Sequence, residues 1–250
     1  MKALITGASS GIGRDMARVL AAMDIELILV ARRGERLREL QRELDVPVEI
    51  IVLDVSVKEN CLALHQRLRK DAVDILINNA GFGDFGEFTQ TDLDKELDMI
   101  YTNIQAVHIL SKLFLRDFVK QDSGYILNVA SSAAFLPGPL MATYYATKAY
   151  VERLTLAMHK ELQKRNSHTS VSVLCPGPVQ TEFDCVANVK FMMKGKTSME
   201  IAEYAIRGMF ENKVIMIPGI LMKGSYLLCK CLPLAVQMEA SYHIQHRKNR

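Results

Sequence analysis

Short, almost wholly apolar segments alternate with amphipathic ones along this chain, and the alternation limits the fold more than any other feature of the sequence. Segments with the length and composition of strands lie at residues 2–6, 27–31, 48–54, 73–78, 125–130, 170–175 and 214–217. Helical patterns lie at 14–23, 35–44, 58–70, 92–118 (one long helix or a pair) and 143–163. Strands that are apolar on both faces belong in a parallel sheet between layers of helices. The sequence therefore predicts an α/β protein, residues 1–250, with one doubly wound sheet of about seven strands.

Composition agrees with a single domain. The chain has 250 residues, of which 49% are apolar and 24% are charged, and its net charge is +3. Such values allow a full core and favour neither a nucleic acid nor an acidic partner. Five scattered cysteines do not form a disulfide scaffold, and Cys229 and Cys231 lack partners at metal-ligand spacing, so we expect reduced thiols and no metal. The first strand begins at residue 2 without a preceding signal segment, which predicts a cytoplasmic protein.

The first strand runs into a glycine-rich turn that leads directly into a helix. The glycines have the spacing Gly-x-x-x-Gly-x-Gly. Glycine lets the backbone approach a pyrophosphate, and a helix N-terminus offers unpaired N–H groups and partial positive charge. Strand, turn and helix therefore predict a Rossmann-type phosphate cradle. Its residues are Gly7, Ser9, Ser10, Gly11, Ile12 and Gly13.

Tyr144 and Lys148 lie four residues apart in a helical stretch, so they share one face of the helix. A free tyrosine has a pKa of about 10 and exchanges protons poorly at neutral pH. A cation one turn away favours the phenolate, and we expect Lys148 to lower the pKa of Tyr144 toward the working range. The adjacent Tyr145 has Ala149 at the same spacing, so Tyr144 is the predicted acid.

Several motifs occur in one order along the chain: Thr6-Gly7-x-x-x-Gly11-x-Gly13, Asn78-Asn79-Ala80-Gly81, Asn103, Ser131, Tyr144-x-x-x-Lys148 and Pro176-Gly177. Their order and spacing over roughly residues 2–181 resemble the short-chain dehydrogenase/reductase family, and the thirteen positions between Ser131 and Tyr144 are typical of it. Ala31-Arg32-Arg33 and Asn79-Ala80-Gly81-Phe82-Gly83 resemble the DltE-type branch of reductases. The resemblance implies an NADP(H)-dependent oxidoreductase that transfers a hydride between nicotinamide and a carbonyl or secondary alcohol.

The resemblance also implies a role for each catalytic residue. Tyr144 donates a proton to the substrate or accepts one from it, Ser131 hydrogen-bonds the substrate oxygen, and Lys148 binds the nicotinamide ribose. Asn103 kinks its helix and holds a water molecule that relays protons to Lys148. Ser132 lies twelve positions before Tyr144, one short of the family spacing, so Ser131 is the predicted serine.

Residues that follow the strands are expected to hold the cofactor. An NAD-preferring relative has an acid after the second strand, whereas this chain has Ala31, Arg32 and Arg33. A guanidinium suits the 2′-phosphate of NADP(H), so we expect Arg32 to be the main contact and Arg33 to point to the other side of the strand end. Alternatively, both arginines begin a solvated helix. By resemblance, the remaining contacts are Asp54, Val55, Asn79, Ala80, Gly81, Tyr144, Lys148, Pro176, Gly177, Val179 and Thr181.

Two regions are expected to shape the substrate end. By resemblance, residues 182–198 form a lid, whose apolar members Phe183, Val186, Phe191, Met192 and Met193 favour a lipophilic substrate, while Lys190, Lys194 and Lys196 equally fit a solvated lid. The C-terminal extension 220–250 begins with an apolar segment, 220–238, that fits a dimer contact, a membrane-surface segment or a helix over the cleft. Residues 243–250 are expected to be a frayed basic end.

The partners and the rival functions follow from the same resemblance. Helices at 92–118 and 143–163 would form the faces of a homodimer or homotetramer, and the substrate is a small molecule. A catalytically retired NADP(H) sensor or scaffold would use the same cradle, and an isomerase or dehydratase would use the same fold with a bound cofactor. The intact set of Ser131, Tyr144 and Lys148 favours the enzyme over the sensor.

Overall fold

The main sheet has seven parallel strands in the order β3-β2-β1-β4-β5-β6-β9. The computed structural model describes residues 1–189 and 195–246. The strands are β1 (Lys2–Thr6), β2 (Glu26–Ala31), β3 (Val48–Val52), β4 (Ile75–Asn78), β5 (Tyr125–Val129), β6 (Ser170–Leu174) and β9 (Ile215–Met216). The predicted doubly wound sheet of seven strands is therefore confirmed.

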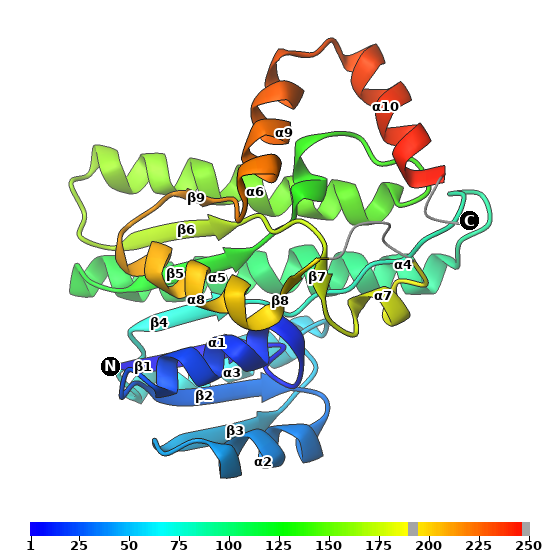
Figure 1. The fold of residues 1–250 in the computed structure, drawn as a ribbon. Helices are drawn as coiled ribbons and strands as arrows, with labels where there is room; N and C mark the ends of the chain where they lie inside the picture. Colours follow the sequence, from blue (N-terminus) through cyan, green and yellow to red (C-terminus); the bar gives the residue numbers. More distant parts are fainter. Residues whose placement is uncertain (190–194, 247–250) are drawn as a thin grey trace.

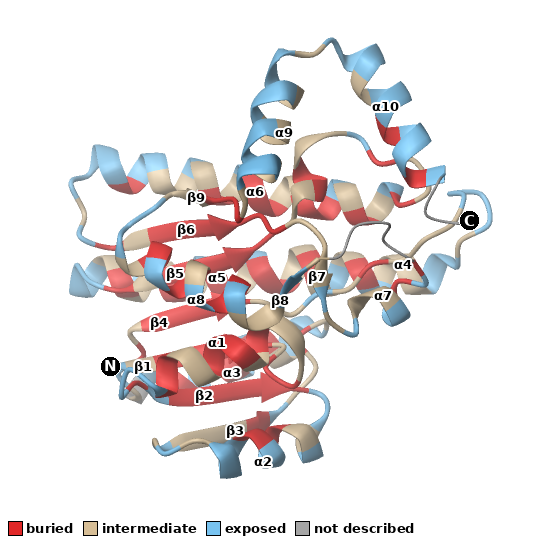
Figure 2. Cartoon of the chain, viewed as in Figure 1, coloured by how far each residue is buried: buried red, intermediate tan, exposed pale blue. Residues whose placement is uncertain are grey.

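Helices cover both faces of the sheet because alternate residues of each strand point to opposite sides. Ala3 and Ile5 of β1 pack in one cluster with helices α1 (Gly11–Ala21), α2 (Gly34–Glu43) and α8 (Ser198–Phe210). Leu4 lies in the cluster on the other face with α3 (Lys58–Arg67), α5 (Val107–Gln121) and α6 (Ala142–Lys164). Figure 2 shows β2, β4, β5 and β6 largely in the red of buried residues, whereas the edge strand β3 is mostly tan.

The predicted helical region 92–118 is a pair of helices with an irregular junction. Helix α4 (Leu93–Ile100) continues through a π-helical segment, Tyr101–Ala106, into α5. Single π-helical turns are rare and often lie at functional sites. Asn103 lies within this segment and is fully buried, so the helix is distorted where the family resemblance places its kink. Short 3₁₀ turns occupy Leu68–Lys70 and Ser132–Phe135.

The segment between β6 and α8 contains a small structure that the sequence did not predict. Strand β7 (Val179–Gln180) pairs in parallel with β8 (Lys196–Thr197), and the short helix α7 (Phe183–Val186) lies between them in the chain. The expectations for Lys190, Phe191, Met192, Met193 and Lys194 lie outside the described residues.

The C-terminal extension forms two helices that project from the sheet and its layers (Figure 1). They are α9 (Ile220–Cys231) and α10 (Leu234–His246), which are separated at Pro233 because proline cannot continue a helix. The expected frayed end is wrong as far as His246, since Gln245 is fully buried and its amide donates to the Tyr145 hydroxyl. Residues 247–250 lie outside the described part. In the described residues, no helix is long and apolar enough to cross a membrane.

Candidate active site

A cavity of about 650 Å³ opens at the carboxyl ends of the strands. It lies beside the ends of β1 and β4, neighbours at which the strand order reverses. Ligands of doubly wound sheets bind at this switch point because the loops from the two halves diverge there. The turn after β1 and the loop after β4 both line the cavity.

All but two of the predicted site residues line this cavity. Those that line it are Gly7, Ser9, Ser10, Gly11, Ile12, Arg32, Arg33, Asp54, Val55, Asn79, Ala80, Gly81, Ser131, Tyr144, Lys148, Pro176, Gly177, Val179 and Thr181. Gly13 and Asn103 do not line the cavity and instead support residues that do. The structure therefore brings together motifs that are dispersed over the first 181 positions of the chain.

The glycine turn and the β4 loop are held together by Thr6 and Asn79. The Thr6 hydroxyl accepts hydrogen bonds from the backbone N–H of Asn79 at 3.0 Å and of Ala80 at 3.1 Å. In return, the Asn79 side-chain amide donates to the carbonyls of Thr6 at 3.0 Å and Gly7 at 3.2 Å. These bonds fix the backbone of the turn in one position relative to the neighbouring strand.

Close packing explains the glycines of the turn. Gly7 has φ +66°, and a Cβ there would lie 2.8 Å from the Ala80 backbone. At Gly13 a Cβ would lie 2.3 Å from the Asn79 amide nitrogen. Gly11 opens helix α1 with φ +54°, facing Thr181 across the cavity. Since the first N–H groups of a helix have no partner within the helix, this cradle fits a pyrophosphate.

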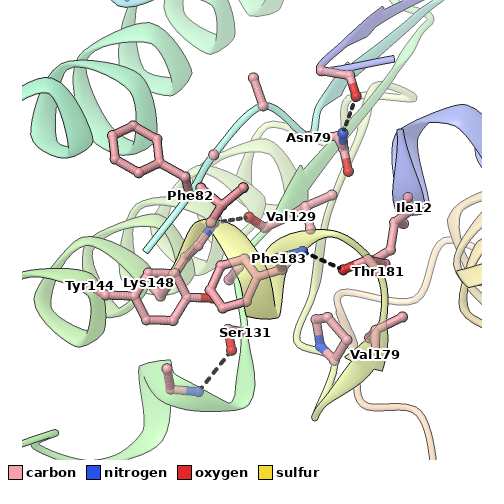
Figure 3. A pocket seen from close by; sticks show the side chains of 18 of the residues that line it. Ile12, Asn79, Phe82, Val129, Ser131, Tyr144, Lys148, Val179, Thr181 and Phe183 are labelled. Atoms are coloured by element: carbon pink, nitrogen blue, oxygen red, sulfur yellow. Dashed lines mark hydrogen bonds between the residues drawn. The ribbon is translucent and has the colours of Figure 1, made fainter. Parts of the chain in front are cut away.

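Ser131, Tyr144 and Lys148 face one another at the other end of the cavity (Figure 3). The Tyr144 hydroxyl is hydrogen-bonded to the Ser131 side chain. The Ser131 hydroxyl also accepts from the Ala133 N–H at 3.1 Å, which fixes its rotamer. The Lys148 ammonium lies 5.8 Å from the centroid of the Tyr144 ring and donates to the Val129 carbonyl at 3.0 Å. The three side chains therefore form one preorganised group.

Burial dominates the acid–base properties of this group. It raises the pKa of Tyr144 above its usual range, and the hydrogen bond from Ser131 acts in the opposite direction. The pKa of Tyr144 is therefore raised in the structure and is not lowered toward the working range as expected. Burial also lowers the pKa of Lys148 itself to about 8, which weakens its action as a fixed cation.

Asn103 supports the group from behind. Its amide nitrogen donates to the Phe82 carbonyl at 2.9 Å and to the Thr147 hydroxyl at 3.0 Å, and its oxygen accepts from the Phe82 N–H at 3.1 Å. A Cβ on Gly81 would lie 2.9 Å from that oxygen and 3.2 Å from the Lys148 nitrogen. Gly81 therefore allows Asn103 and Lys148 to approach each other through the β4 loop.

The two arginines after β2 are placed differently from the prediction. Arg33 was expected to point to the other side of the strand end, but its guanidinium turns into the glycine turn and donates to Ser9 and Ser10. Arg32 has a side chain that is 71% exposed and lies 3.7 Å from an Asp54 oxygen. Hydroxyl acceptors in the turn attract Arg33, and local sequence spacing did not reveal them. Both arginines line the cavity.

Apolar side chains from distant segments close the substrate end. The centroid of the Phe183 ring of α7 lies 5.3 Å from the centroid of the Tyr144 ring. Leu221 and Met222 of α9 and Ile244 of α10 also line the cavity, so part of the C-terminal extension borders the cleft. Lining residues for which sequence reasoning gave no role include Thr102, Val129, Ala130, Ala133 and Met141. Glu182, at the start of the predicted lid, also lines the cavity, whereas no sequence signal points to Met141.

A Rossmann-type sheet with a glycine cradle and a Ser–Tyr–Lys group at its carboxyl edge defines a nucleotide-binding oxidoreductase. The short chain dehydrogenase family model matches residues 1–189, and the chain belongs to this family.

Individual relatives agree with this assignment. An uncharacterized oxidoreductase of Staphylococcus epidermidis is 33% identical over 181 residues, which are 72% of this chain and 78% of that protein. Human inactive hydroxysteroid dehydrogenase-like protein 1 is 31% identical over 193 residues, 74% of this chain and 58% of that protein. The structure of a short-chain dehydrogenase from Sphingobium yanoikuyae in complex with NADPH is 31% identical, with a TM-score of 0.81 over 94% of this chain and 97% of that chain.

Proposed function

We propose that the chain is an NADP(H)-dependent oxidoreductase that acts on a carbonyl or a secondary alcohol. The observation that carries the proposal is the presence of Ser131, Tyr144 and Lys148 in the same cavity as the glycine cradle. The NADPH in the similar Sphingobium structure supports the class of cofactor. When bound, that cofactor supplies the hydride, whereas the protein supplies binding, orientation and the proton.

The cavity offers a contact for each part of a dinucleotide. The glycine turn and the N-terminus of α1 hold the pyrophosphate. Arg32 and Arg33 lie where a 2′-phosphate attached to the adenosine ribose would be recognised, with Asp54 and Val55 on the adenine side. The turn from Pro176 to Thr181 holds the nicotinamide end, and Lys148 binds its ribose.

In the proposed reduction, the protein supplies the proton that the carbonyl oxygen takes up. Because burial raises its pKa, Tyr144 is protonated and is competent to donate to a carbonyl oxygen. Ser131 hydrogen-bonds Tyr144 and can donate to the same substrate oxygen as negative charge develops there. Asn103 holds the Gly81–Phe82 backbone beside Lys148, and we propose that a water molecule relays protons between them.

The substrate is lipophilic in this proposal. Apolar side chains from the β4 loop, the start of α6, α7, α9 and α10 line the cavity: Phe82, Met141, Phe183, Val186, Leu221, Met222 and Ile244. Burial of apolar substrate surface against them contributes about 25 cal/mol for each Å². A polar substrate would leave its own groups unpaired against this wall.

Two copies are proposed to pack through helices α5 and α6, as in family members of this length. His108 of α5 hydrogen-bonds the Tyr150 hydroxyl of α6 at 2.7 Å on an exposed face, so the two helices present one joint surface. Light scattering of the purified protein measures the number of copies, and a monomer at micromolar concentration would rule this contact out.

The proposed function is tested by a screen of carbonyl compounds and alcohols in which nicotinamide absorbance is followed with each cofactor. Tyr144→Phe is expected to reduce turnover by about 10²- to 10⁴-fold, the usual contribution of a general acid, while NADPH binding stays near wild type. Tyr145→Phe is the matched control and retains turnover. Loss of turnover in Tyr145→Phe alone would show that the wrong tyrosine has been assigned.

Two outcomes of the same screen identify the rival functions. A retired sensor or scaffold binds NADPH but turns over no compound; the human relative is named as inactive. An isomerase or dehydratase converts substrate without a net change in nicotinamide absorbance. Mass spectrometry of the reaction products separates these two cases.

A further inference from the structure

We propose that Glu182 sets the cofactor preference, because its carboxylate competes with the 2′-phosphate of NADP(H) for the guanidinium of Arg33. This inference rests on the proposed NADP(H) dependence. Glu182 is the first residue of the predicted lid, and Arg33 lies 149 positions away in the chain. Both residues nevertheless line the same cavity. A carboxylate from one side of the cleft thus neutralises a cation on the other.

Two arginines hold the Glu182 carboxylate. Arg33 donates from Nη1 to Oε2 at 2.9 Å, and Arg36 donates from its own Nη1 to Oε1. These bonds hold the pKa of Glu182 below its usual value, so its charge is present throughout the neutral range. Both oxygens of the carboxylate are therefore engaged by the cations that begin α2.

The hydrogen bonds of Arg33 leave little capacity for another anion. Besides Glu182, its guanidinium donates from Nε and Nη2 to the Ser9 hydroxyl, each at 3.2 Å, and from Nη2 to the Ser10 hydroxyl at 2.8 Å. These bonds use most of the N–H donors that a guanidinium has. A phosphate that binds to Arg33 must therefore replace one of the partners already there.

Charge determines which partner is displaced. A phosphate monoester carries roughly −1.5 to −2 charges at neutral pH, so it repels the Glu182 carboxylate but not the serine hydroxyls. NADPH must therefore break the ion pair with Glu182, whereas NADH, which has no phosphate at this position, leaves the pair in place. Glu182 consequently weakens NADPH binding and reduces the preference for NADPH over NADH that Arg32 and Arg33 create.

The test compares the dissociation constants of NADPH and NADH for the wild type, Glu182→Gln and Glu211→Gln. Gln keeps the size of the side chain and removes only its charge. Glu211 is a matched control because it forms an ion pair with Lys213 and does not line the cavity. We expect Glu182→Gln to bind NADPH about three- to tenfold more tightly, as the loss of one or two exposed ion pairs allows, with NADH unchanged.

The outcomes separate this inference from the proposed function. Unchanged or weaker NADPH binding by Glu182→Gln overturns the competition, and weaker binding would mean that Glu182 orients Arg33 instead. An equal gain for NADPH and NADH also overturns it. A wild type that binds NADH more tightly than NADPH refutes the proposed cofactor preference, yet a selective gain for NADPH in Glu182→Gln would still support the competition.

Discussion

Replacement of Lys148 by Met is expected to stabilise the protein at neutral pH and to abolish its activity. The side chain is buried, and burial lowers its pKa from 10.5 to about 8. Below pH 8 the folded protein therefore carries a buried ammonium whose desolvation opposes folding. We propose that Lys148 serves the reaction at the expense of stability.

The magnitude follows from the lowered pKa. The difference between 10.5 and about 8 corresponds to about 3 kcal/mol of lost stability below pH 8. Met removes this cost but loses the hydrogen bond to the Val129 carbonyl, worth roughly 0.5–1.5 kcal/mol. The expected net gain for Lys148→Met at pH 7 is therefore about 1.5–2.5 kcal/mol.

The sign of the pH dependence is also determined. The folded-state pKa lies below the unfolded one, so between pH 8 and 10.5 the unfolded chain binds more protons than the folded protein. Wild-type stability therefore rises with pH across this window, and Lys148→Met lacks this contribution. The advantage of the variant is expected to shrink as the pH rises from 7 to 9.5.

Urea unfolding of both proteins at pH 7 and pH 9.5, without added cofactor, measures this difference. Lys160→Met is the control, because Lys160 lies on the same helix, is exposed and bonds only to Gln163 in the described structure. A Lys148→Met variant that is less stable at pH 7, or whose difference from wild type is the same at both pH values, would refute the reasoning.

Two further variants test the cofactor end. Arg32→Ala and Arg33→Ala are each expected to weaken NADPH binding about 10- to 150-fold and to leave NADH binding near wild type, because each removes a charge-assisted hydrogen bond to the 2′-phosphate. Fluorescence titration measures the dissociation constant of each cofactor. Equal losses of affinity for NADPH and NADH would indicate that the two arginines are merely solvated. Gly13→Ala is expected to lower the free energy of unfolding by about 1–3 kcal/mol, since its Cβ would lie 2.3 Å from the Asn79 amide nitrogen. Gly224→Ala, where a Cβ meets nothing within 4 Å, is the control, and equal unfolding midpoints for the two variants would contradict the packing argument.

The sheet could be predicted from the sequence because burial leaves a local pattern. Strands β1, β2, β4 and β5 are buried on both faces, so each reads as an apolar run. The glycine turn and the Tyr144–Lys148 pair were predictable for a similar reason, since their residues are close together in the chain. Asp54 was expected to end a strand, but β3 ends at Val52, because strand ends depend on pairing with a neighbour.

Interactions between distant residues could not be predicted in this way. The orientation of Arg33 depends on Glu182, 149 positions away, and on two hydroxyls of the glycine turn. The raised pKa of Tyr144 depends on burial, to which Phe183 of the lid contributes through ring contact. A sequence pattern gives the types of the residues at a site, whereas their hydrogen bonds and desolvation are determined by the packed structure.

The residues that line the two ends of the cavity differ in how far the family model covers them. The cradle, the arginines and the Ser131–Tyr144–Lys148 group all lie within residues 1–189, which the family model matches. Leu221, Met222 and Ile244, which wall the substrate end, lie beyond it in α9 and α10. Gln245 attaches α10 to Tyr145, 100 positions away, and places Ile244 over the cleft. We therefore propose that substrate choice by this chain depends on contacts made by α7, which lies within the matched residues, and by α9 and α10, which lie beyond them.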